Sequence, residues 1–256
     1  MKEQKYEIDF YEKIGNWDFS DINCETEKLS NWDFYEKIRE NSNEKSLCLD
    51  LGTGGGEKVL QYYPKVQMII ATDLSKKMIE TAKKNAKNHP EKIVKFAQMS
   101  NLEITFPNEI FDLVSARHTI IEAKQIYDVL NDDGVLVIEG IDRKDCWSLK
   151  EMFGRGQGFH DEISIAQKDY EDLKKAGFSE IQKVEIYENE YYKTKEDLLA
   201  LLLKTPILDD ISEFSTEAWQ HTKKIENEIF DKYVKQNKTQ RGIRLERVLY
   251  GIVAKK

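Results

Sequence analysis

The stretch LDLGTGGGE (residues 49–57) places four glycines directly after a short apolar run. A glycine-rich turn between a strand and a helix presents backbone N–H groups and a helix N-terminus to an anionic or carboxylate-bearing ligand. A dinucleotide loop would need a third glycine where this chain has Glu57, and its pyrophosphate would be repelled by Asp50 and Glu57. The stretch therefore favours a ligand that carries positive charge.

Around this loop, apolar strand-like runs alternate with amphipathic helical segments. We expect strands at 46–51, 66–72, 93–98, 111–116, 135–139, 181–192 and 247–254, and helices at 57–63, 76–87, 122–130 and 165–176. Ser75 is the expected N-cap of the second helix, and residues 131–134 (NDDG) are an expected turn. Continuous apolar strands separated by helices are typical of a parallel sheet covered on both faces. We therefore expect an α/β fold that binds its ligand at the carboxyl ends of the strands.

The chain is expected to have four parts. Residues 1–44 would form an N-terminal helical cap segment, because FYEKIGNWDF (10–19) and NWDFYEKIRE (31–40) repeat an amphipathic pattern whose aromatic residues would be buried. Residues 45–192 would form the core, 193–240 a helical insertion or lid, and 241–256 the final strand of the core.

Asp73 is the second signal for a nucleoside ligand. It closes the second expected strand, 21 residues after Gly52. A carboxylate at this place can accept hydrogen bonds from both hydroxyls of a ribose. Together with the glycine loop in a strand–helix–strand context, Asp73 indicates a nucleoside cofactor.

On these residues the chain resembles the class I S-adenosylmethionine-dependent methyltransferases. The matching segments are DLGTGGG (50–56), IIATDLSKKMIETAKKN (69–85), FPNEIFDLVSARHTI (106–120) and DDGVLVIEG (132–140). The resemblance implies a doubly wound, seven-stranded, mostly parallel, Rossmann-like sheet whose last strand is antiparallel and inserted beside the fifth. It also implies S-adenosyl-L-methionine as the cofactor and S-adenosyl-L-homocysteine as its product.

The resemblance further implies a set of cofactor-binding residues near the strand ends: Asp50, Gly52, Thr53, Gly54, Gly56, Asp73, Leu74, Met78, Ser100, Asn101, Ala116 and Arg117. In this set the glycine loop and Asp50 face the methionine part, and Asp73 takes the ribose hydroxyls. Leu74 and Met78 pack on adenine. Ser100 and Asn101 depart from the family, because many relatives have an acid there for the adenine amino group. Backbone oxygen at residues 116 and 117 would face the cofactor's ammonium.

Methyl transfer is an in-line displacement that needs a general base only when the acceptor must lose a proton. His118 follows the fourth expected strand and is the candidate catalytic base; the alternative is a histidine that only hydrogen-bonds the loop backbone. The candidate substrate-binding residues are Trp17, Glu139, Arg155, Gln157 and His160. Buried packing, surface salt bridges and an ordinary glycine-rich connection are the competing interpretations of these five.

The composition favours a small-molecule acceptor over nucleic acid. The 256 residues carry a net charge of -8, and an acidic protein repels a phosphate backbone. An RNA methyltransferase is the first alternative, and a non-catalytic protein that binds S-adenosylmethionine is the second. A dehydrogenase that uses NAD is the weakest candidate, because Glu57 replaces the third glycine.

Three scattered cysteines and four histidines have neither CxxC nor HxxxH spacing, so we expect no metal site. The charged N-terminus has no apolar signal region, and no apolar run approaches the length of a membrane span. We therefore expect a cytoplasmic enzyme that acts away from membranes as a monomer or homodimer.

Overall fold

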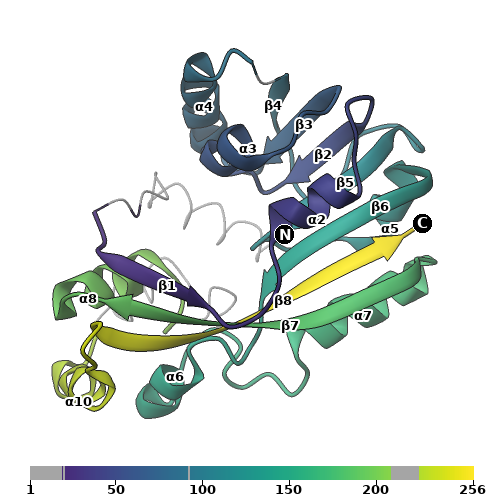
Figure 1. Cartoon of the computed structure of the whole chain (residues 1–256). Coiled ribbons are helices and arrows are strands. Elements are labelled where there is room, and N and C mark those ends of the chain that lie inside the picture. Colours follow the sequence, from purple (N-terminus) through teal and green to yellow (C-terminus); the bar gives the residue numbers. More distant parts are fainter. Residues whose placement is uncertain (1–18, 20, 92, 209–224) are drawn as a thin grey trace. The chain divides into compact units, whose positions relative to one another are not determined.

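The computed structural model describes residues 19, 21–91, 93–208 and 225–256, which form parts of two compact units (Figure 1). The first unit comprises residues 1–31, 142–164 and 185–249, as far as they are described. The second comprises residues 32–141, 165–184 and 250–256. The four-part division expected from the sequence stays a prediction.

The second unit is built on a mostly parallel sheet. Its strands are β2 (Leu47–Leu51), β3 (Met68–Asp73), β4 (Val94–Gln98), β5 (Phe111–Arg117) and β6 (Leu130–Ile141), joined by parts of β7 (Ser179–Tyr192) and β8 (Ile243–Lys255). The hydrogen-bonded order is β7-β8-β6-β5-β2-β3-β4, with β2 to β6 mutually parallel where they pair.

Strand β8 is antiparallel to both of its neighbours. The Ser179 hydroxyl at the start of β7 donates to the Lys255 carbonyl at the end of β8. The Lys256 N–H likewise donates to the carbonyl of Gly134, early in β6. The expected fold, with an antiparallel last strand beside the fifth expected strand, is therefore confirmed.

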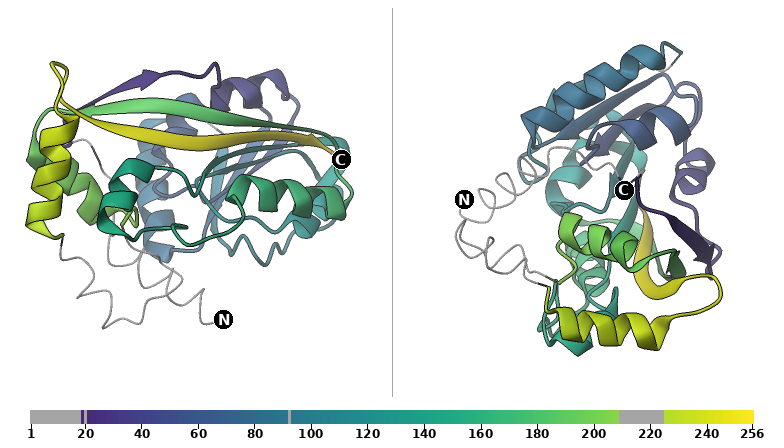
Figure 2. Two further views of the ribbon diagram at one scale, coloured as in Figure 1. Left: turned by 90° about the horizontal axis from the view of Figure 1, so that it is seen from below. Right: turned by 90° about the vertical axis from the view of Figure 1, so that its left-hand side faces the viewer.

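Helices cover both faces of this sheet (Figure 2). Leu49 and Leu51 of β2 pack in the core beneath α5 (Ala123–Val129) and α7 (Ile165–Ala176). Cys48 faces the other core, beneath α2 (Phe34–Glu40) and α3 (Glu57–Tyr62). This alternation follows from the two-residue period of a strand, and both of its faces are apolar because both are buried.

Local sequence signals place α4 (Lys76–Asn85) correctly. The Ser75 hydroxyl accepts the Met78 N–H at 3.3 Å, so the expected N-cap is confirmed. Met78, Ile79 and Ala82 are buried on one helix face. A short 3-10 turn, η1 (Ala86–Asn88), follows the helix where the sequence predicts that the helix continues to residue 87.

The expected turn at residues 131–134 is wrong, because these residues lie within β6 as an irregularity. Phe111 pairs with Leu130 and Leu113 pairs with Val135, so two steps along β5 match five along β6. The extra residues loop out of the ladder without ending the strand, and Asp133 has φ +66° there.

The first unit adds an edge strand that the sequence does not predict. Strand β1 (Cys24–Lys28) pairs antiparallel with the second half of β7, from Cys24 opposite Tyr192 to Lys28 opposite Glu188. The sheet therefore has eight strands rather than the expected seven. Charged residues suit an edge strand, because they oppose pairing with other chains. The helix expected at 10–19 lies almost entirely outside the described residues.

Three helices of the first unit share one apolar core: α6 (Trp147–Phe153), α8 (Lys195–Lys204) and α10 (Asn227–Asn237). The capping box between Thr194 and Asp197 starts α8. Leu198 of α8 and Phe230 of α10 are fully buried in this core. The leucine-rich run of α8 thus serves packing, and residues 209–224 of the expected insertion lie outside the described part.

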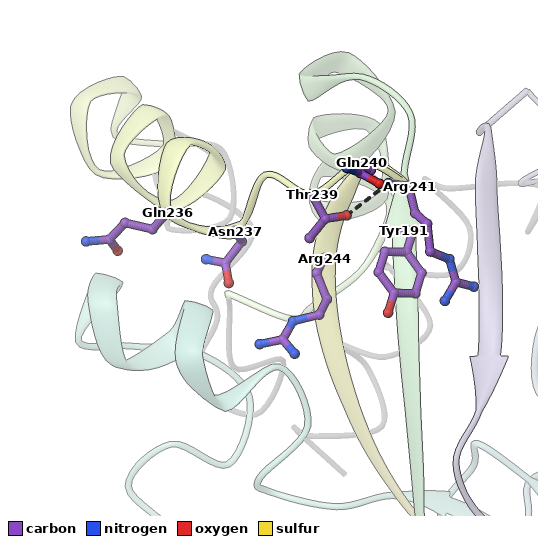
Figure 3. Close-up of a pocket in the computed structure, with 7 residues that line it drawn as sticks. All are labelled: Tyr191, Gln236, Asn237, Thr239, Gln240, Arg241 and Arg244. Atoms are coloured by element: carbon purple, nitrogen blue, oxygen red, sulfur yellow. Dashed lines mark hydrogen bonds between the residues drawn. The ribbon is translucent and has the colours of Figure 1, made fainter.

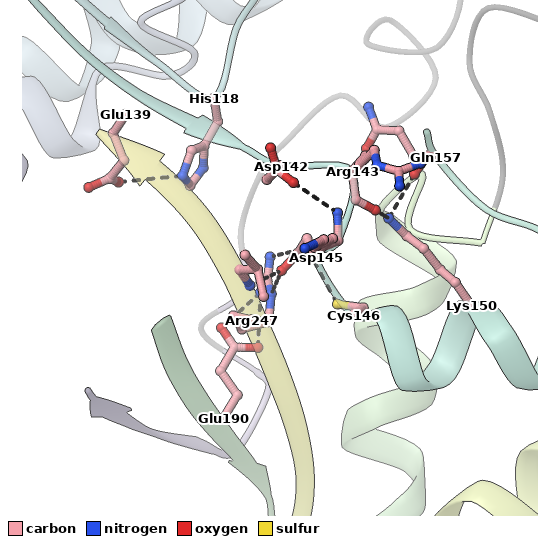
Figure 4. Close-up of polar contacts among 12 residues, drawn as sticks. His118, Glu139, Asp142, Arg143, Asp145, Cys146, Lys150, Gln157, Glu190 and Arg247 are labelled. Atoms are coloured by element: carbon pink, nitrogen blue, oxygen red, sulfur yellow. Dashed lines mark hydrogen bonds and ion pairs between the residues drawn. The ribbon is translucent and has the colours of Figure 1, made fainter. Parts of the chain in front are cut away.

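Arg247 links buried Asp145 and half-buried Glu190 within the first unit (Figure 4). Its Nε and Nη2 donate to Asp145 at 2.8 and 3.1 Å, and its Nη1 donates to both Glu190 oxygens at 2.9 and 3.0 Å. Asp145 is 1% exposed and also accepts the Val248 N–H. One guanidinium therefore balances a carboxylate that is fully buried, Asp145, and one that is partly buried, Glu190.

Arg247→Met is expected to lower the free energy of unfolding by about 3–5 kcal/mol, because Asp145 loses its cation while fully buried and Glu190 loses the same cation while partly buried. Urea unfolding followed by circular dichroism measures the loss. Arg241→Met is the matched control: Arg241 also contacts two carboxylates, those of Glu25 and Glu27, but at the surface, where the loss should be much smaller. Equal losses in the two variants would contradict the importance of burial.

Candidate functional site

The glycine loop between β2 and α3 requires residues without side chains. Gly52, Gly54 and Gly56 have φ of +72°, +58° and +77°, where a β-carbon is disfavoured. A β-carbon on Gly52 would lie 2.7 Å from that of Thr119, whereas one on Gly54 would meet nothing within 4 Å. The loop is therefore packed at Gly52 and open at Gly54.

Asp73 fixes this loop from the end of β3. One carboxylate oxygen accepts the Gly54 N–H at 2.9 Å, and the other accepts the Ser75 N–H at 2.9 Å. Burial raises the pKa of Asp73, and the two N–H donors partly offset that effect. Because each carboxylate oxygen has a second lone pair, Asp73 can still accept two hydroxyl donors.

Glu57, the acid in place of a third glycine, is turned toward α4. Its carboxylate accepts the Asn85 side-chain N–H at 3.0 Å, and the same amide nitrogen donates to the Gly55 carbonyl at 2.9 Å. Glu57 is exposed. The observed contacts of Glu57 and Asn85 therefore fasten the loop to a neighbouring helix.

Asp50 is buried beneath the loop, with 4% of its surface exposed. Its Oδ1 accepts the Ser115 hydroxyl at 2.7 Å, and the Ser115 oxygen lies 3.1 Å from the Tyr63 hydroxyl. Burial raises the pKa of Asp50 to about 6, although the Ser115 hydrogen bond and the Arg117 charge oppose that rise. The ionised form is thus disfavoured here, and a cation nearby would compensate for this.

Asn101 follows β4 and carries an unmatched acceptor. Its Nδ2 donates to Thr119 Oγ1 at 2.8 Å and to the Ile120 carbonyl at 3.3 Å, so its Oδ1 points elsewhere. This Oδ1 is buried and receives no hydrogen bond from any residue that the structure describes. A buried acceptor without a donor is costly, and a ligand N–H would satisfy it.

The other residues expected at the cofactor lie in the same unit. Leu74 is half-buried directly after Asp73, and Met78 is 1% exposed on α4. Ser100 uses its hydroxyl to accept the Leu102 N–H in a turn. Ala116 is buried near the end of β5, where it pairs with Leu51.

Arg117 and His118 both contact Glu139, near the end of β6. Arg117 Nε donates to Glu139 Oε1 at 2.8 Å, and His118 Nε2 lies 3.4 Å from the same oxygen. Burial alone would raise the pKa of Glu139, but the His118 hydrogen bond and the Arg117 charge outweigh it and bring the pKa to about 2. Glu139 is therefore ionised at neutral pH.

The remaining candidates belong to the first unit or lie outside the described residues. Arg155 donates to the Leu208 carbonyl at 2.6 Å, and the Gln157 N–H donates to that of Ile207 at 3.2 Å. His160 packs edge-on against Phe159. Trp17 lies outside the described residues.

Lys150 organises the loop that carries these candidates, although its sequence context gives no sign of this role. It is 2% exposed, and its Nζ donates to the carbonyls of Arg143 and Gln157 at 3.2 and 2.7 Å (Figure 4). Gly156 could not carry a side chain, because its β-carbon would lie 2.5 Å from the Ile207 carbonyl oxygen. The loop is therefore fixed by contacts within its own unit.

A pocket of the first unit offers no comparable chemistry. Figure 3 shows its lining residues: Tyr191, Gln236, Asn237, Thr239, Gln240, Arg241 and Arg244. Arg241 lies 3.9 Å from the Tyr191 ring centre and pairs with Glu25 and Glu27, while Arg244 pairs with Glu246. Both arginines that line this pocket therefore already form ion pairs with carboxylates.

Among the helices of the described ranges, none is both long and apolar enough to cross a membrane. Within these same ranges, no three His, Cys, Asp or Glu side chains are grouped as metal ligands would be.

The sequence matches known methyltransferases around the glycine loop. Residues 49–138 match the family described as "Methyltransferase domain". Over 70 residues, the chain is 34% identical to the uncharacterized methyltransferase YcgJ of Bacillus subtilis (strain 168). This match covers 27% of the chain and 28% of that relative, so it spans less than a third of the relative's length.

The fold resembles three solved structures over most of the chain. The YcgJ structure has a TM-score of 0.55 at 16% identity and covers 86% of this chain and 96% of its own. A functionally unknown protein from Deinococcus radiodurans R1 has a TM-score of 0.54 at 14% identity, and the match covers 91% of this chain and 90% of that protein. The structure of the [4+2]-cyclase SpnF has a TM-score of 0.54 at 16% identity, and the match covers 87% of this chain and 80% of the SpnF chain. At these identities the likeness shows the fold alone.

Asp50→Asn is expected to raise the free energy of unfolding at pH 7.5 by about 1–3 kcal/mol. The pKa of Asp50 is about 6 in the folded chain, above its ordinary value of 3.8. The stability that protonated Asp50 contributes to the folded state is therefore fully present below pH 3.8, and it is lost as the pH rises through about 6. Asparagine can still accept the Ser115 hydroxyl without this loss. Urea unfolding at pH 7.5 and 4.5 should show the advantage shrinking at the lower pH; a constant difference would contradict it.

Proposed function

We propose that the chain transfers a methyl group from S-adenosylmethionine to a small molecule. Through residues 49–138 it belongs to the class I S-adenosylmethionine-dependent methyltransferases. The observation that carries the proposal is the contact of Asp73 with the glycine loop. Its carboxylate is anchored by the Gly54 and Ser75 N–H groups, beside a loop that is open at Gly54. A fixed pair of acceptors at this place suits the two hydroxyls of a ribose.

The donor groups of this cofactor fit the residues present. Asn101 Oδ1 is a buried acceptor without a donor in the described part of the chain, and the adenine amino group is a donor. Half-buried Leu74 supplies apolar surface for the adenine ring, with buried Met78 behind it in our assignment. In our assignment Asp73 holds the ribose, and the backbone of Ala116 accepts from the ammonium.

When bound, S-adenosylmethionine supplies a methyl group on an electrophilic sulfonium. Because the methyl carbon is already activated, the chain has only to bind both substrates, orient the acceptor toward the methyl group and exclude water. Buried Asp50 lies under the loop with its pKa raised to about 6. Positive charge beside it would favour the carboxylate form, so Asp50 suits a cationic ligand better than a pyrophosphate.

The net charge of the chain, -8 at pH 7, supports a small-molecule acceptor over RNA, because an acidic protein repels the phosphate backbone. Arg155, Gln157 and His160 remain our candidates for contacting the acceptor, together with Trp17. The likeness to a cyclase shows that this fold also serves a protein named for other chemistry, so methyl transfer needs its own test.

Calorimetry is expected to show binding of S-adenosylmethionine and S-adenosylhomocysteine, and none of NAD. Asp73→Ala should weaken binding of S-adenosylmethionine by at least about 100-fold, since two hydrogen bonds to a carboxylate are lost at roughly 1.5–3 kcal/mol each. Glu80→Ala, on the exposed side of α4, is the control and should bind as the wild type does. A preference for NAD, or full affinity in Asp73→Ala, would overturn the cofactor assignment.

Incubation with methyl-labelled S-adenosylmethionine and a bacterial extract is expected to label small molecules rather than RNA. The two fractions are separated by size and counted, with Asp73→Ala as the inactive reference. Label recovered in RNA would favour an RNA methyltransferase, and binding without any labelled product would favour the non-catalytic alternative.

A further inference from the structure

The Arg117 guanidinium lies at the carboxyl end of β5, beside the glycine loop. Because Ala116 pairs with Leu51 of β2, the residue after it is level with Gly52, the first glycine of the loop. The Arg117 side chain is 34% exposed, so a ligand can reach its guanidinium. The guanidinium therefore belongs to the same edge of the sheet as the candidate cofactor site.

Glu139 fixes this guanidinium by one nitrogen only. Arg117 Nε donates to Glu139 Oε1 at 2.8 Å, and the Trp32 indole N–H donates to Glu139 Oε2 at 3.1 Å. Trp32 is in turn buried against β8, where a β-carbon on Gly251 would lie 2.5 Å from the indole. Within the described part of the chain, nothing accepts a hydrogen bond from Arg117 Nη1 or Nη2. Because these two atoms carry most N–H donors of a guanidinium, Arg117 is held in place with most of its donors unused.

The Tyr35 hydroxyl of α2 is a second donor close enough to feel the same charges. Tyr35 is half-buried, and its ring is held by three aromatic neighbours at centroid distances of 5.1, 5.5 and 6.3 Å: Phe34, Tyr62 and Tyr63. Burial and the charge of Asp50 raise the pKa of Tyr35, whereas the charge of Arg117 opposes that rise. The hydroxyl is therefore protonated at neutral pH, and no residue of the described ranges forms a hydrogen bond with it.

Negative charge lies beside these two donors. Asp50 is buried under the loop, and the nearby Arg117 charge favours its carboxylate form against the effect of burial. A ligand group that suits this arrangement carries an anion for the donors and a cation for Asp50. An α-amino acid group carries both charges on neighbouring atoms, whereas a pyrophosphate carries only negative charge. The charges therefore favour a zwitterionic amino-acid group at this place.

We propose that Arg117 and Tyr35 bind the carboxylate at the amino-acid end of the cofactor, and that Glu139 positions Arg117 for this contact. The inference rests on the proposed function. A planar guanidinium presents parallel N–H groups that match the two oxygens of a carboxylate, and the Tyr35 hydroxyl adds a neutral donor. The ammonium of the same amino-acid group then lies toward Asp50 and the Ala116 carbonyl oxygen.

Calorimetry of the full chain with two cofactors that differ only in the carboxylate tests this assignment. The wild type should bind S-adenosylmethionine at least about tenfold more tightly than decarboxylated S-adenosylmethionine, because the latter cannot accept these hydrogen bonds. This preference should fall by about tenfold in Arg117→Met, which loses a charged donor, and by about threefold in Tyr35→Phe, which loses a neutral one. A loosened fold would weaken binding of both cofactors alike, so the ratio of the two affinities isolates the carboxylate.

Two matched variants control for the loss of a charge or a hydroxyl elsewhere. Arg39→Met removes an arginine of α2 that pairs with Glu36 at the surface, and Tyr62→Phe removes the hydroxyl of an exposed neighbouring tyrosine. Both should keep the wild-type preference. Equal binding of the two cofactors by the wild type, or an unchanged preference in Arg117→Met or Tyr35→Phe, would overturn this inference and leave the proposed function in place. A wild type that binds neither cofactor would overturn both.

Discussion

The hydrogen bonds that Asp73 accepts from Gly54 and Ser75 are the constraint on which the site depends. One carboxylate joins three segments: the end of β3, the loop after β2 and the start of α4. Parallel pairing of Leu51 with Thr72 brings these segments together. Because both oxygens are held by backbone N–H groups, their free lone pairs point in set directions before any ligand arrives. The candidate site is therefore preorganised, and preorganisation of this kind lowers the entropy cost of binding a ligand.

Features that depend on near neighbours in the sequence could be predicted. The core strands are continuous apolar runs, and α7 covers residues 165–176 as expected. Ser75 caps α4 because a hydroxyl at this position competes well for an unsatisfied backbone N–H. The spacing of Asp73 from the loop also follows from local geometry, since one helix and one strand separate them.

Features that depend on distant pairing could not be predicted. Strand β1 is a charged segment whose conformation is set by β7, more than 150 residues later. Arg247 and Asp145 meet across 102 positions, and neither has a sequence pattern that predicts an ion pair. From the sequence, Glu139 is a candidate to bind the acceptor. In the structure its two carboxylate oxygens accept hydrogen bonds from Trp32 and Arg117 instead. Sequence periodicity reports burial, not which partner a polar group finds.

The place of β8 in the sheet has a consequence for synthesis of the chain. Residues 250–255 lie between β7 and β6, although they are made long after β6. Until they leave the ribosome, the backbone groups of β6 that face β8 lack their partner, and the sheet retains a temporary open edge. Such an edge is open to wrong pairing with other chains. The fold therefore cannot mature strand by strand as it is translated, and it depends on a late closing step.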